Sequence, residues 1–394
     1  MQIADRLSQI RPSVTLAINS RAQELRAQGI QVTSLAVGEP DFPTPPHIRE
    51  AAKAAIDANF TRYTAVAGIP ELRRAAGAYF ERHYATPVAP ESIIIGAGGK
   101  QCLYTFLQTA INPGDEVLIP SPYWVSYPDM VRLAGGVPVT VPAGAELGFK
   151  VTPLMLENHV SDRTRLLILN SPCNPSGAVY ADREFMHIMR WALARNIFVL
   201  SDEIYDQLVF KPAQMTSAIT WFAHCPELVA VVNGLSKSYA MTGWRVGFMA
   251  AHPEIIRKMT ALQGHSLSNV CSVAQKAALA ALEGPDDCLM EMRRAFHRRR
   301  DLAMDIVSAW PGVVCPRPDG AFYLFVDVSA LYGGEISDST SLCSYLLDRA
   351  HVALVPGAAF GDDRCVRLSY AVADDALADA LRRVGEALAA LARQ

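Results

Sequence analysis

One lysine with unusual neighbours is the first residue in this sequence that could do chemistry. Lys237 lies within Val231 to Ala250, VVNGLSKSYAMTGWRVGFMA, between an apolar run that ends at Val232 and a second apolar run that Arg245 begins. A lysine among small and apolar residues can have a lowered pKa and attack a carbonyl carbon as a nucleophile. Taken alone, the stretch fits an ordinary surface lysine between two strands better, so the rest of the chain must decide.

A glycine-rich turn earlier in the chain could bind a phosphate group. The sequence Gly96-Ala97-Gly98-Gly99-Lys100-Gln101 follows a short apolar run and opens a predicted helix. Free backbone amides at a helix N-terminus bind phosphate. The glycine spacing is not G-x-G-x-x-G, and no Walker lysine-serine pair follows, so one small phosphate fits better than a dinucleotide or nucleotide. A tight turn that simply needs glycine is the open alternative.

Two more predicted strand ends carry polar residues. In Asn170 to Gly177, NSPCNPSG, two prolines and a glycine fix a loop that presents Asn174 to an anionic oxygen. Asp202 follows the next apolar strand, and Tyr205 comes three residues later. A partly buried carboxylate needs a cationic or N–H partner. A rigid turn would also explain Asn174, and an N-cap would explain Asp202 but not Tyr205.

Pyridoxal 5′-phosphate is the cofactor whose requirements these residues meet together. We expect Lys237 to form a Schiff base with its aldehyde, and Asp202 to pair with its pyridine nitrogen, so that the ring can accept carbanion electrons. Asn174 and Tyr205 are expected to hydrogen-bond the phenolate oxygen of the ring. The residues predicted to hold the phosphate are Gly98, Gly99, Lys100, Ser236 and Arg245. Trp124 is predicted to lie flat on the ring.

Strands and helices alternate regularly in the middle of the chain. Short apolar strands alternate with helices from Ser92 to Ala250, which predicts an α/β fold with a mostly parallel sheet sandwiched by helices. Ligands bind at the carboxyl edge of such a sheet, where the four motifs above fall. One helix is predicted over Tyr123 to Leu133.

Both ends of the chain are predicted to differ from this middle part. Before it we expect a helix from Pro12 to Gln28, a strand from Val32 to Val37, and a stiff proline-rich loop from Gly38 to Pro46. After Pro253 come helices and an α+β tail. We predict three parts: residues 1–45, an N-terminal arm and part of a small domain; 46–285, a large cofactor-binding domain; and 286–394, the C-terminal small domain.

Composition excludes several classes of protein. The 394 residues carry a net charge of −3, and the basic run His297-Arg298-Arg299-Arg300 in a predicted long helix fits a solvated face, or pairs with acidic neighbours, better than nucleic acid. Eight scattered cysteines without C-x-x-C spacing suggest reduced thiols and no metal site. No signal core or membrane-length apolar run is present. We therefore expect a cytoplasmic protein that binds neither nucleic acid nor membrane.

The motifs, in their order, resemble one family along nearly the whole chain. The sequence is similar to class I pyridoxal-phosphate-dependent aminotransferases of fold type I, in the bacterial aspartate aminotransferase subgroup. The matching segments are LAVGEPDFPTP, YTAVAGIPELR, GAGGKQ, NPGDEVLIPSPYWVSYP, SPCNPSGAVY, SDEIYD, SKSYAMTGWRVGF, GAFYLF, LVPGAAFG and VRLSYA. The resemblance implies a parallel-sheet large domain and a smaller α+β domain made of the N-terminal arm and the C-terminal part.

The resemblance also implies roles for further residues. Lys237, Asp202 and Tyr205 are the implied catalytic residues. Arg367 would clamp the substrate α-carboxylate, a bidentate role that suits its planar guanidinium. Tyr63 would cross a dimer interface to the partner's cofactor phosphate, which implies a homodimer with shared active sites. The other implied substrate contacts are Gly38 through its backbone, Trp124, Asn174, and, for a distal carboxylate, Lys100, Ser13 and Thr15.

Four positions depart from the family pattern. Cys173 stands where the family usually has asparagine, and Ser176 where it usually has threonine; we expect little effect in a loop. Gly234 stands where many members carry a serine that touches the phosphate. Arg11 stands where members that accept prephenate tend to have lysine, which leaves prephenate activity open.

The implied activity is the transfer of an amino group between L-aspartate, or a related amino acid, and 2-oxoglutarate. Lys237 would act as general base, and two half-reactions would give ping-pong kinetics. The alternatives are an aminotransferase for prephenate, aromatic amino acids or alanine, and a C–S lyase that uses the same cofactor. A ligand-sensing regulator would need an N-terminal DNA-binding module, for which we expect no room before Val32. The glycine spacing argues against a nucleotide-dependent dehydrogenase.

Overall fold

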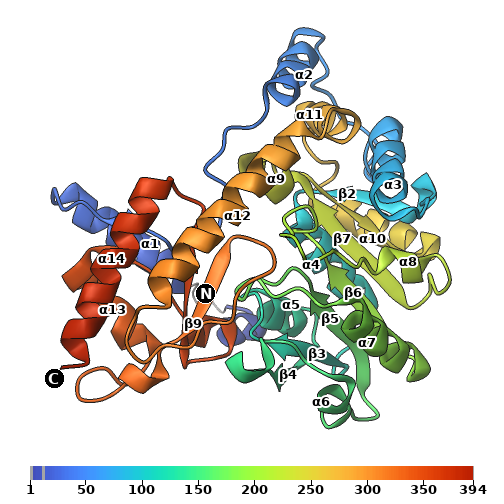
Figure 1. Cartoon of the computed structure of the whole chain (residues 1–394). Helices are drawn as coiled ribbons and strands as arrows, with labels where there is room; N and C mark the ends of the chain where they lie inside the picture. Colours follow the sequence, from blue (N-terminus) through green and yellow to red (C-terminus); the bar gives the residue numbers. More distant parts are fainter. Residues whose placement is uncertain (1–2, 11–13, 394) are drawn as a thin grey trace.

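A seven-stranded sheet forms the centre of the molecule in the computed structural model, which describes residues 3–10 and 14–393 (Figure 1). Its strand order is β2-β8-β7-β6-β5-β3-β4, and only β8 runs antiparallel to its neighbours. The predicted mostly parallel sheet is therefore confirmed. Its strands are β2 (Ile93–Gly96), β3 (Glu116–Ser121), β4 (Val137–Pro142), β5 (Thr164–Asn170), β6 (Phe198–Asp202), β7 (Val229–Gly234) and β8 (Gly247–Ala250).

Helices cover both faces of this sheet, because successive residues of each strand point to opposite faces and both sets are apolar. Leu166 and Ile168 of β5 pack in a cluster with α4 (Gly99–Ala110), α5 (Tyr127–Leu133) and α10 (Pro253–Ser266). Leu167 and Leu169 pack in the opposite cluster. That second cluster includes residues of α3 (Pro70–Tyr84), α7 (Asp182–Ala194), α8 (Ile219–Phe222) and α11 (Ser272–Glu283).

The N-terminal and C-terminal segments build the rest of the fold together. β1 (Thr33–Ser34) pairs in parallel with β10 (Val352–Ala353), although their first partners, Thr33 and Val352, are 319 residues apart in sequence. A separate antiparallel sheet has the order β11-β12-β9, formed by β11 (Val355–Pro356), β12 (Cys365–Ser369) and β9 (Tyr323–Asp327). Figure 1 shows α1 (Val14–Ala27), α13 (Ser339–Ala350) and α14 (Asp374–Leu391) at one side, with α12 (Asp287–Val307) running from them toward α11. The boundaries at residues 45 and 285 stay a prediction.

The remaining helical elements are short or peripheral. They are α2 (Pro46–Asp57), α6 (Pro153–Glu157), α9 (Leu235–Ser238) and the 3-10 turns η1 (Asp5–Gln9), η2 (Pro90–Ser92), η3 (Ala145–Leu147), η4 (Thr242–Trp244), η5 (Ser329–Leu331) and η6 (Gly357–Phe360). Across the described ranges, none of the helices combines the length and the apolar character that a bilayer span requires.

Two predicted elements are shorter than the sequence suggested. The helix predicted from Tyr123 begins only at Tyr127, because the Tyr123 N–H donates to the Phe360 carbonyl and the preceding residues form a turn. The strand predicted over Val32 to Val37 is limited to β1, because the Ala36 carbonyl accepts from a side chain, Arg367, instead of a neighbouring strand. The helix predicted from Pro12 is α1, and residues 11–13 lie outside the described ranges.

Candidate active site

The candidate residues collect at the carboxyl edge of the central sheet. Asn170 at the end of β5 is level with Asp202 at the end of β6, which in turn is level with Val232 of β7. Lys237 follows β7 in α9, and the glycine turn follows β2. Adjacent parallel strands thus deliver residues far apart in sequence to one place, as expected for the ligand edge of an α/β sheet.

Lys237 points at Gly38, whose backbone the family resemblance implies as a substrate contact. Its Nζ donates a 2.7 Å hydrogen bond to the Gly38 carbonyl oxygen, across 199 residues of sequence. Burial lowers the pKa of Lys237 to about 8, with Arg245, Arg367 and Lys100 lowering it further and Glu39 opposing them. A substantial fraction of this amine is therefore uncharged just above neutral pH, which nucleophilic attack requires.

Asp202 is a buried carboxylate with two donors of its own. The Tyr127 hydroxyl donates to Oδ2 at 2.6 Å, and the Ile204 N–H donates to Oδ1 at 3.2 Å. Burial raises the pKa of Asp202 to about 6, while the bonds from Tyr127 and Ile204 and the charge of Lys237 oppose that rise. Asp202 thus caps the turn that follows it, as the N-cap interpretation expects, and that interpretation alone does not explain Tyr205. Mostly ionised at pH 7, Asp202 can pair with a protonated ring nitrogen.

Arg367 and Asn174 contact each other at the centre of the site. Arg367 is 4% exposed; its Nη1 donates to Asn174 Oδ1 at 3.0 Å and its Nη2 donates to the Ala36 carbonyl at 2.7 Å. The Nε of Arg367 is buried without a partner in the described part of the chain. A buried, unpaired N–H is costly unless a ligand accepts from it. The site therefore fits an anionic ligand such as a carboxylate, and Asn174 keeps its amide nitrogen for another acceptor.

Tyr205 lies in the same buried network. Its hydroxyl shares a 2.8 Å hydrogen bond with the Tyr323 hydroxyl, and the Tyr323 ring lies against the Arg367 guanidinium, 4.6 Å from centroid to Cζ. At Gly38 a Cβ atom would stand 2.5 Å from the Tyr323 hydroxyl oxygen. The close approach of this backbone to the site therefore depends on glycine at position 38.

The glycine turn and Arg245 form a cradle that suits a phosphate. Helix α4 begins after Gly98 without a side-chain cap, so the first N–H groups of this 12-residue helix lack intrahelical acceptors. Gly98 has φ of +85°, and any Cβ there would collide with the Arg245 guanidinium, which donates to the Ala97 carbonyl at 3.1 Å. Ser236 is buried at the start of α9.

Lys100 and Arg245 bring positive charge to this cradle. The Lys100 ammonium lies 4.7 Å from the centroid of the Trp124 ring. Burial and the charge of Arg245 lower the pKa of Lys100. Positive charges gathered at the N-terminus of a helix fit the phosphate of the predicted cofactor.

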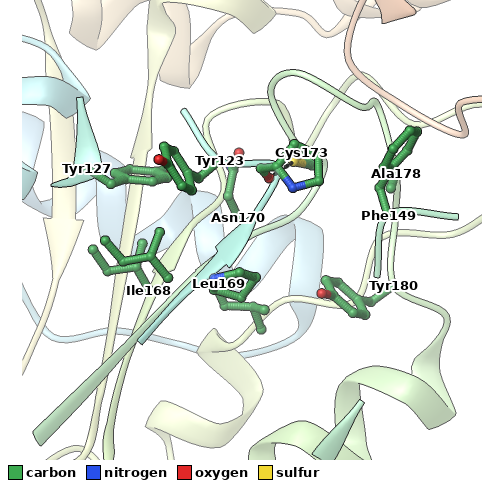
Figure 2. A pocket seen from close by; sticks show the side chains of 12 residues that line it. Tyr123, Tyr127, Phe149, Ile168, Leu169, Asn170, Cys173, Ala178 and Tyr180 are labelled. Atoms are coloured by element: carbon green, nitrogen blue, oxygen red, sulfur yellow. Dashed lines mark hydrogen bonds between the residues drawn. The ribbon is translucent and has the colours of Figure 1, made fainter. Parts of the chain in front are cut away.

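Three residues that the sequence analysis did not select support the site. Asn170 donates from Nδ2 to the Asp202 carbonyl and accepts from the Asn174 N–H, both at 2.9 Å, and Tyr127 holds the Asp202 carboxylate as described above. Figure 2 shows Tyr127 and Asn170 among the residues that line a cavity of about 20 Å³, room for one water molecule. Tyr323 is the third. All three lie in or next to recognised motifs, but nothing in a single sequence tells which of their neighbours they contact.

The other predicted residues are placed as follows. Tyr63 is 91% exposed within this chain. Ser13 and Arg11 lie outside the described residues, and Thr15 belongs to α1 but its side chain is outside the described part. Cys173 and Ser176 are buried in the loop after β5. A Cβ at Gly234 would stand 2.8 Å from the Ile204 Cδ1, so a serine here would require Ile204 to move.

Comparisons with known proteins give the same family as the motifs. The family model described as aminotransferase class I and II matches residues 30–384. A relative from Cereibacter sphaeroides, named aspartate/prephenate aminotransferase, is 46% identical over 97% of each chain. One from Bacillus sp. strain YM-2, named aspartate aminotransferase, is 43% identical over 97% of this chain and 98% of its own.

A solved structure agrees with the fold. The aspartate aminotransferase of Thermus thermophilus, solved with maleate, has a TM-score of 0.93 and 39% identity, covering 98% of this chain and all of its own. The predicted resemblance and the predicted fold type are confirmed. This chain belongs to the class I and II aminotransferase family.

Proposed function

We propose that this protein is a pyridoxal-phosphate-dependent aminotransferase that moves the amino group between L-aspartate and 2-oxoglutarate. The observation that carries the proposal is the meeting of Lys237, Asp202 and the Gly98–Arg245 cradle at one sheet edge, beside the unpaired Nε of Arg367. A nucleophilic amine, a buried carboxylate, a phosphate cradle and a carboxylate clamp are the parts that this chemistry needs.

Each end of the cofactor has residues suited to hold it. Lys237 would hold the aldehyde carbon, Asp202 the ring nitrogen, and Asn174 with Tyr205 the phenolate oxygen. Trp124 would cover the ring, and the residues for the phosphate are Gly98, Gly99, Lys100, Ser236 and Arg245. When bound, the cofactor supplies an electron-withdrawing ring that stabilises negative charge at the substrate α-carbon.

The chain's own residues bind the substrate and move its proton. Arg367 binds the α-carboxylate, and its contacts with Asn174 and Ala36 hold the guanidinium in place. Lys237, with its lowered pKa, is uncharged often enough to take the α-proton and return it to the cofactor side as general base and acid. The Gly38 carbonyl accepts a hydrogen bond from Lys237 Nζ, so it lies next to the nitrogen that takes and returns this proton.

A preference for dicarboxylic substrates is part of the proposal. Lys100 at the end of the glycine turn, with Ser13 and Thr15, would meet the distal carboxylate. The relatives named aspartate aminotransferase and the Thermus structure with maleate, a dicarboxylate, support this preference. The relative named aspartate/prephenate aminotransferase favours prephenate as a second candidate substrate.

Lys100→Ala tests the role in substrate choice. We expect kcat/KM for aspartate and glutamate to fall about 10-fold more than kcat/KM for alanine, because a lost charge-assisted contact costs about 1.5–3 kcal/mol. The matched comparison is the same variant on alanine, which has no distal carboxylate. Equal losses on both substrates would exclude a distal-carboxylate role for Lys100.

We also propose a cytoplasmic homodimer with shared active sites. Tyr63, 91% exposed in one chain, would reach the partner's cofactor phosphate. All eight cysteines are free, which fits a reducing compartment. Light scattering on the purified protein tests whether it is a dimer. A mixture of Lys237→Ala and Tyr63→Phe chains tests whether the sites are shared, because mixed dimers should recover activity only if each site uses residues of both chains.

One experiment tests the proposed function directly. The purified protein should show the visible absorption band of a lysine-bound cofactor, and aspartate and glutamate should bleach it while 2-oxoglutarate restores it. A panel of prephenate, aromatic amino acids and alanine then ranks the substrates. A colourless protein that takes up no added pyridoxal phosphate would overturn the proposal.

A further inference from the structure

The loop that faces Lys237 has no regular structure of its own to fix its position. Residues 38–45 form neither helix nor strand, yet Gly38 supplies the carbonyl that accepts from Lys237 Nζ. Three prolines make the segment stiff but do not anchor it. Side-chain contacts must therefore hold it at the site.

One buried arginine from the distant helix α12 supplies the main anchor. Arg299 donates from Nη1 to Asp41 Oδ1 at 2.6 Å and from Nη2 to Asp41 Oδ2 at 2.9 Å, a bidentate pair across 258 residues of sequence. Its Nε donates to Asp374 Oδ1 at 2.9 Å, at the start of α14. Every nitrogen of this guanidinium is thus engaged, and the side chain is only 8% exposed.

Aromatic rings cover the Arg299 side of this ion pair, while the Asp41 carboxylate keeps contact with solvent. The Arg299 guanidinium carbon lies 5.5 Å from the Phe42 ring centroid and 5.8 Å from that of Phe296, and the two rings meet edge to face at 5.7 Å. Phe42 follows Asp41 directly, so loop and helix are joined by both charge and apolar contact. A bidentate pair with a largely buried guanidinium is stronger and more directional than a single contact between two exposed groups.

The far end of the loop is tied to the segment that carries Lys237. Thr44 Oγ1 donates to the Ala240 carbonyl at 2.7 Å and accepts from Trp244 Nε1 at 3.0 Å. The loop therefore spans from α12 and α14 to the Lys237 segment. Because Asp41 is three residues from Gly38, a shift of Asp41 moves the backbone at Gly38.

We propose that Arg299 is a positioning residue for the substrate, which holds loop 38–45 so that Gly38 and the neighbouring Arg367 site keep the geometry that binds the amino acid. This inference rests on the proposed function and adds a residue that does not touch the substrate. It also gives a role to the basic run 297–300, which pairs with acidic neighbours, one of the two interpretations that the sequence left open.

The neighbouring arginine offers a matched control. Arg298 also pairs with Asp374, through Nε at 2.8 Å, but its side chain is 61% exposed and makes no contact with Asp41. Arg298→Lys and Arg299→Lys thus each replace a guanidinium by an ammonium group, at adjacent positions of the same helix. Lysine keeps the charge but cannot form the planar, bidentate pair.

The test compares Arg299→Lys, Asp41→Asn and Arg298→Lys. Hydrogen exchange of the amides at the two ends of the loop, in cofactor-free protein, should be about 10-fold faster in the first two variants and unchanged in Arg298→Lys. These amides are those of Leu35, which donates to the Ala353 carbonyl, and of Ile48 and Arg49, which donate to the Pro45 carbonyl. In the loaded enzyme, the KM for aspartate should rise about 10-fold with kcat within about twofold, because substrate positioning and not chemistry is lost. The absorption band and the Kd of pyridoxal phosphate should stay at wild-type values.

The outcomes separate this inference from the proposed function. Wild-type loop exchange and KM in Arg299→Lys and Asp41→Asn would overturn the role of Arg299. A general loss of stability with equal loss of kcat and cofactor affinity would also overturn it, since that is the pattern of a merely structural ion pair. If the wild-type protein takes up no pyridoxal phosphate, the proposed function fails, while the exchange experiment still decides whether Arg299 holds the loop.

Discussion

The two halves of the candidate site are built in different ways. On the side of the central sheet, Asp202 is the last residue of its strand, and Asn174 and Lys237 each follow a strand end within four residues. On the opposite side, the parts come from remote places: Arg367 of β12 contacts Asn174 across 193 residues and Ala36 across 331. The first half follows from the general rule that ligands bind at the carboxyl edge of a parallel sheet. The second half forms only when the N-terminal and C-terminal segments pack against the central sheet.

This difference separates two kinds of chemistry. In our proposal the sheet edge carries the residues for a cofactor, whose rigid shape suits groups fixed on strand ends. The bridging half, made of residues 36–44 with Arg367 and Arg299, carries the proposed site for the substrate α-carboxylate. A change on the sheet side should therefore affect chemistry and cofactor binding, and a change on the bridging side should affect substrate affinity.

Lys237→Ala gives the largest expected effect and tests the sheet side. The variant should still bind pyridoxal phosphate through the phosphate cradle, but transamination should fall by about 10⁴-fold, the upper range for a lost proton-transfer group. Stopped-flow and steady-state assays with aspartate measure this. Lys150→Ala, which removes a lysine paired with Glu184 on the large domain, is the control and should keep its activity. Turnover at the wild-type rate in Lys237→Ala would exclude its catalytic role.

Arg367→Lys tests the bridging side. Lysine cannot replace the bonds to Asn174 and Ala36 together with the free Nε, so kcat/KM should fall about 100-fold, as for a lost charge-assisted pair of about 2–3 kcal/mol. The loss should be equal for aspartate and alanine, because both carry the α-carboxylate. Arg364→Lys, which disturbs only an exposed pair with Asp362, is the control. A loss confined to dicarboxylic substrates would assign Arg367 to the other carboxylate.

The same contrast explains what could be predicted from the sequence. The parallel sheet and the residues at its edge follow from short apolar runs and the turns after them, because strand, turn and ligand group are consecutive. The loop predicted over Gly38 to Pro46 is irregular as expected, except that Pro46 begins α2, and its stiffness stays a prediction. Its anchor could not be found from the sequence. Asp41 and Arg299 are 258 residues apart, and a basic run in a helix looks the same whether it faces solvent or a carboxylate of a distant loop.

The family resemblance predicted some of these long-range site residues but not all of them. The motif VRLSYA pointed to Arg367, which periodicity alone would have read as an ordinary strand residue. Tyr127 lies in another recognised motif, and the sequence still did not indicate that its hydroxyl donates to Asp202, 75 residues away. The helix predicted over Tyr123 to Leu133 was wrong in its first turn, because α5 begins only at Tyr127.

Tyr127→Phe sharpens the description of the sheet side. The lost hydrogen bond stabilised the ionised form of Asp202, so the pKa of this carboxyl should rise from about 6 by roughly one unit. Pyridoxal phosphate binds best when Asp202 is ionised, which is above its pKa. The midpoint at which cofactor affinity falls on acidification should therefore move to higher pH, with affinity about fivefold weaker near pH 6 and close to wild type near pH 8.

Tyr180→Phe is the control for that experiment. Tyr180 lines the same cavity (Figure 2), but its hydroxyl accepts from the Val151 N–H and does not contact Asp202. The variant should leave the pH midpoint of cofactor binding in place. An equal shift in both variants would show that the cavity wall, and not the hydroxyl of Tyr127, sets the ionisation of Asp202.

Glu203→Gln gives the smallest expected effect and marks the boundary of the sheet-side site. Glu203 follows Asp202 directly but points into the core, where it accepts from Ser201 and Ser217 hydroxyls and the Ala218 N–H. Burial raises the pKa of Glu203 to about 8. Because the folded state keeps this proton when the unfolded chain has lost it, the carboxyl lowers stability progressively as pH rises from about 4.5 to about 8.

Glu203→Gln removes this pH dependence of stability, because glutamine does not titrate, and it keeps one acceptor oxygen. The Tm of Glu203→Gln relative to wild type should therefore rise by about 2 °C or more between pH 5 and pH 8, measured by calorimetry, while kcat/KM stays within about twofold. Glu227→Gln, at an exposed position, should show no such change. A loss of activity comparable to that of a site variant would mean that the sheet-side site extends one residue beyond Asp202 into the core, and the two neighbouring carboxylates would then act as a pair.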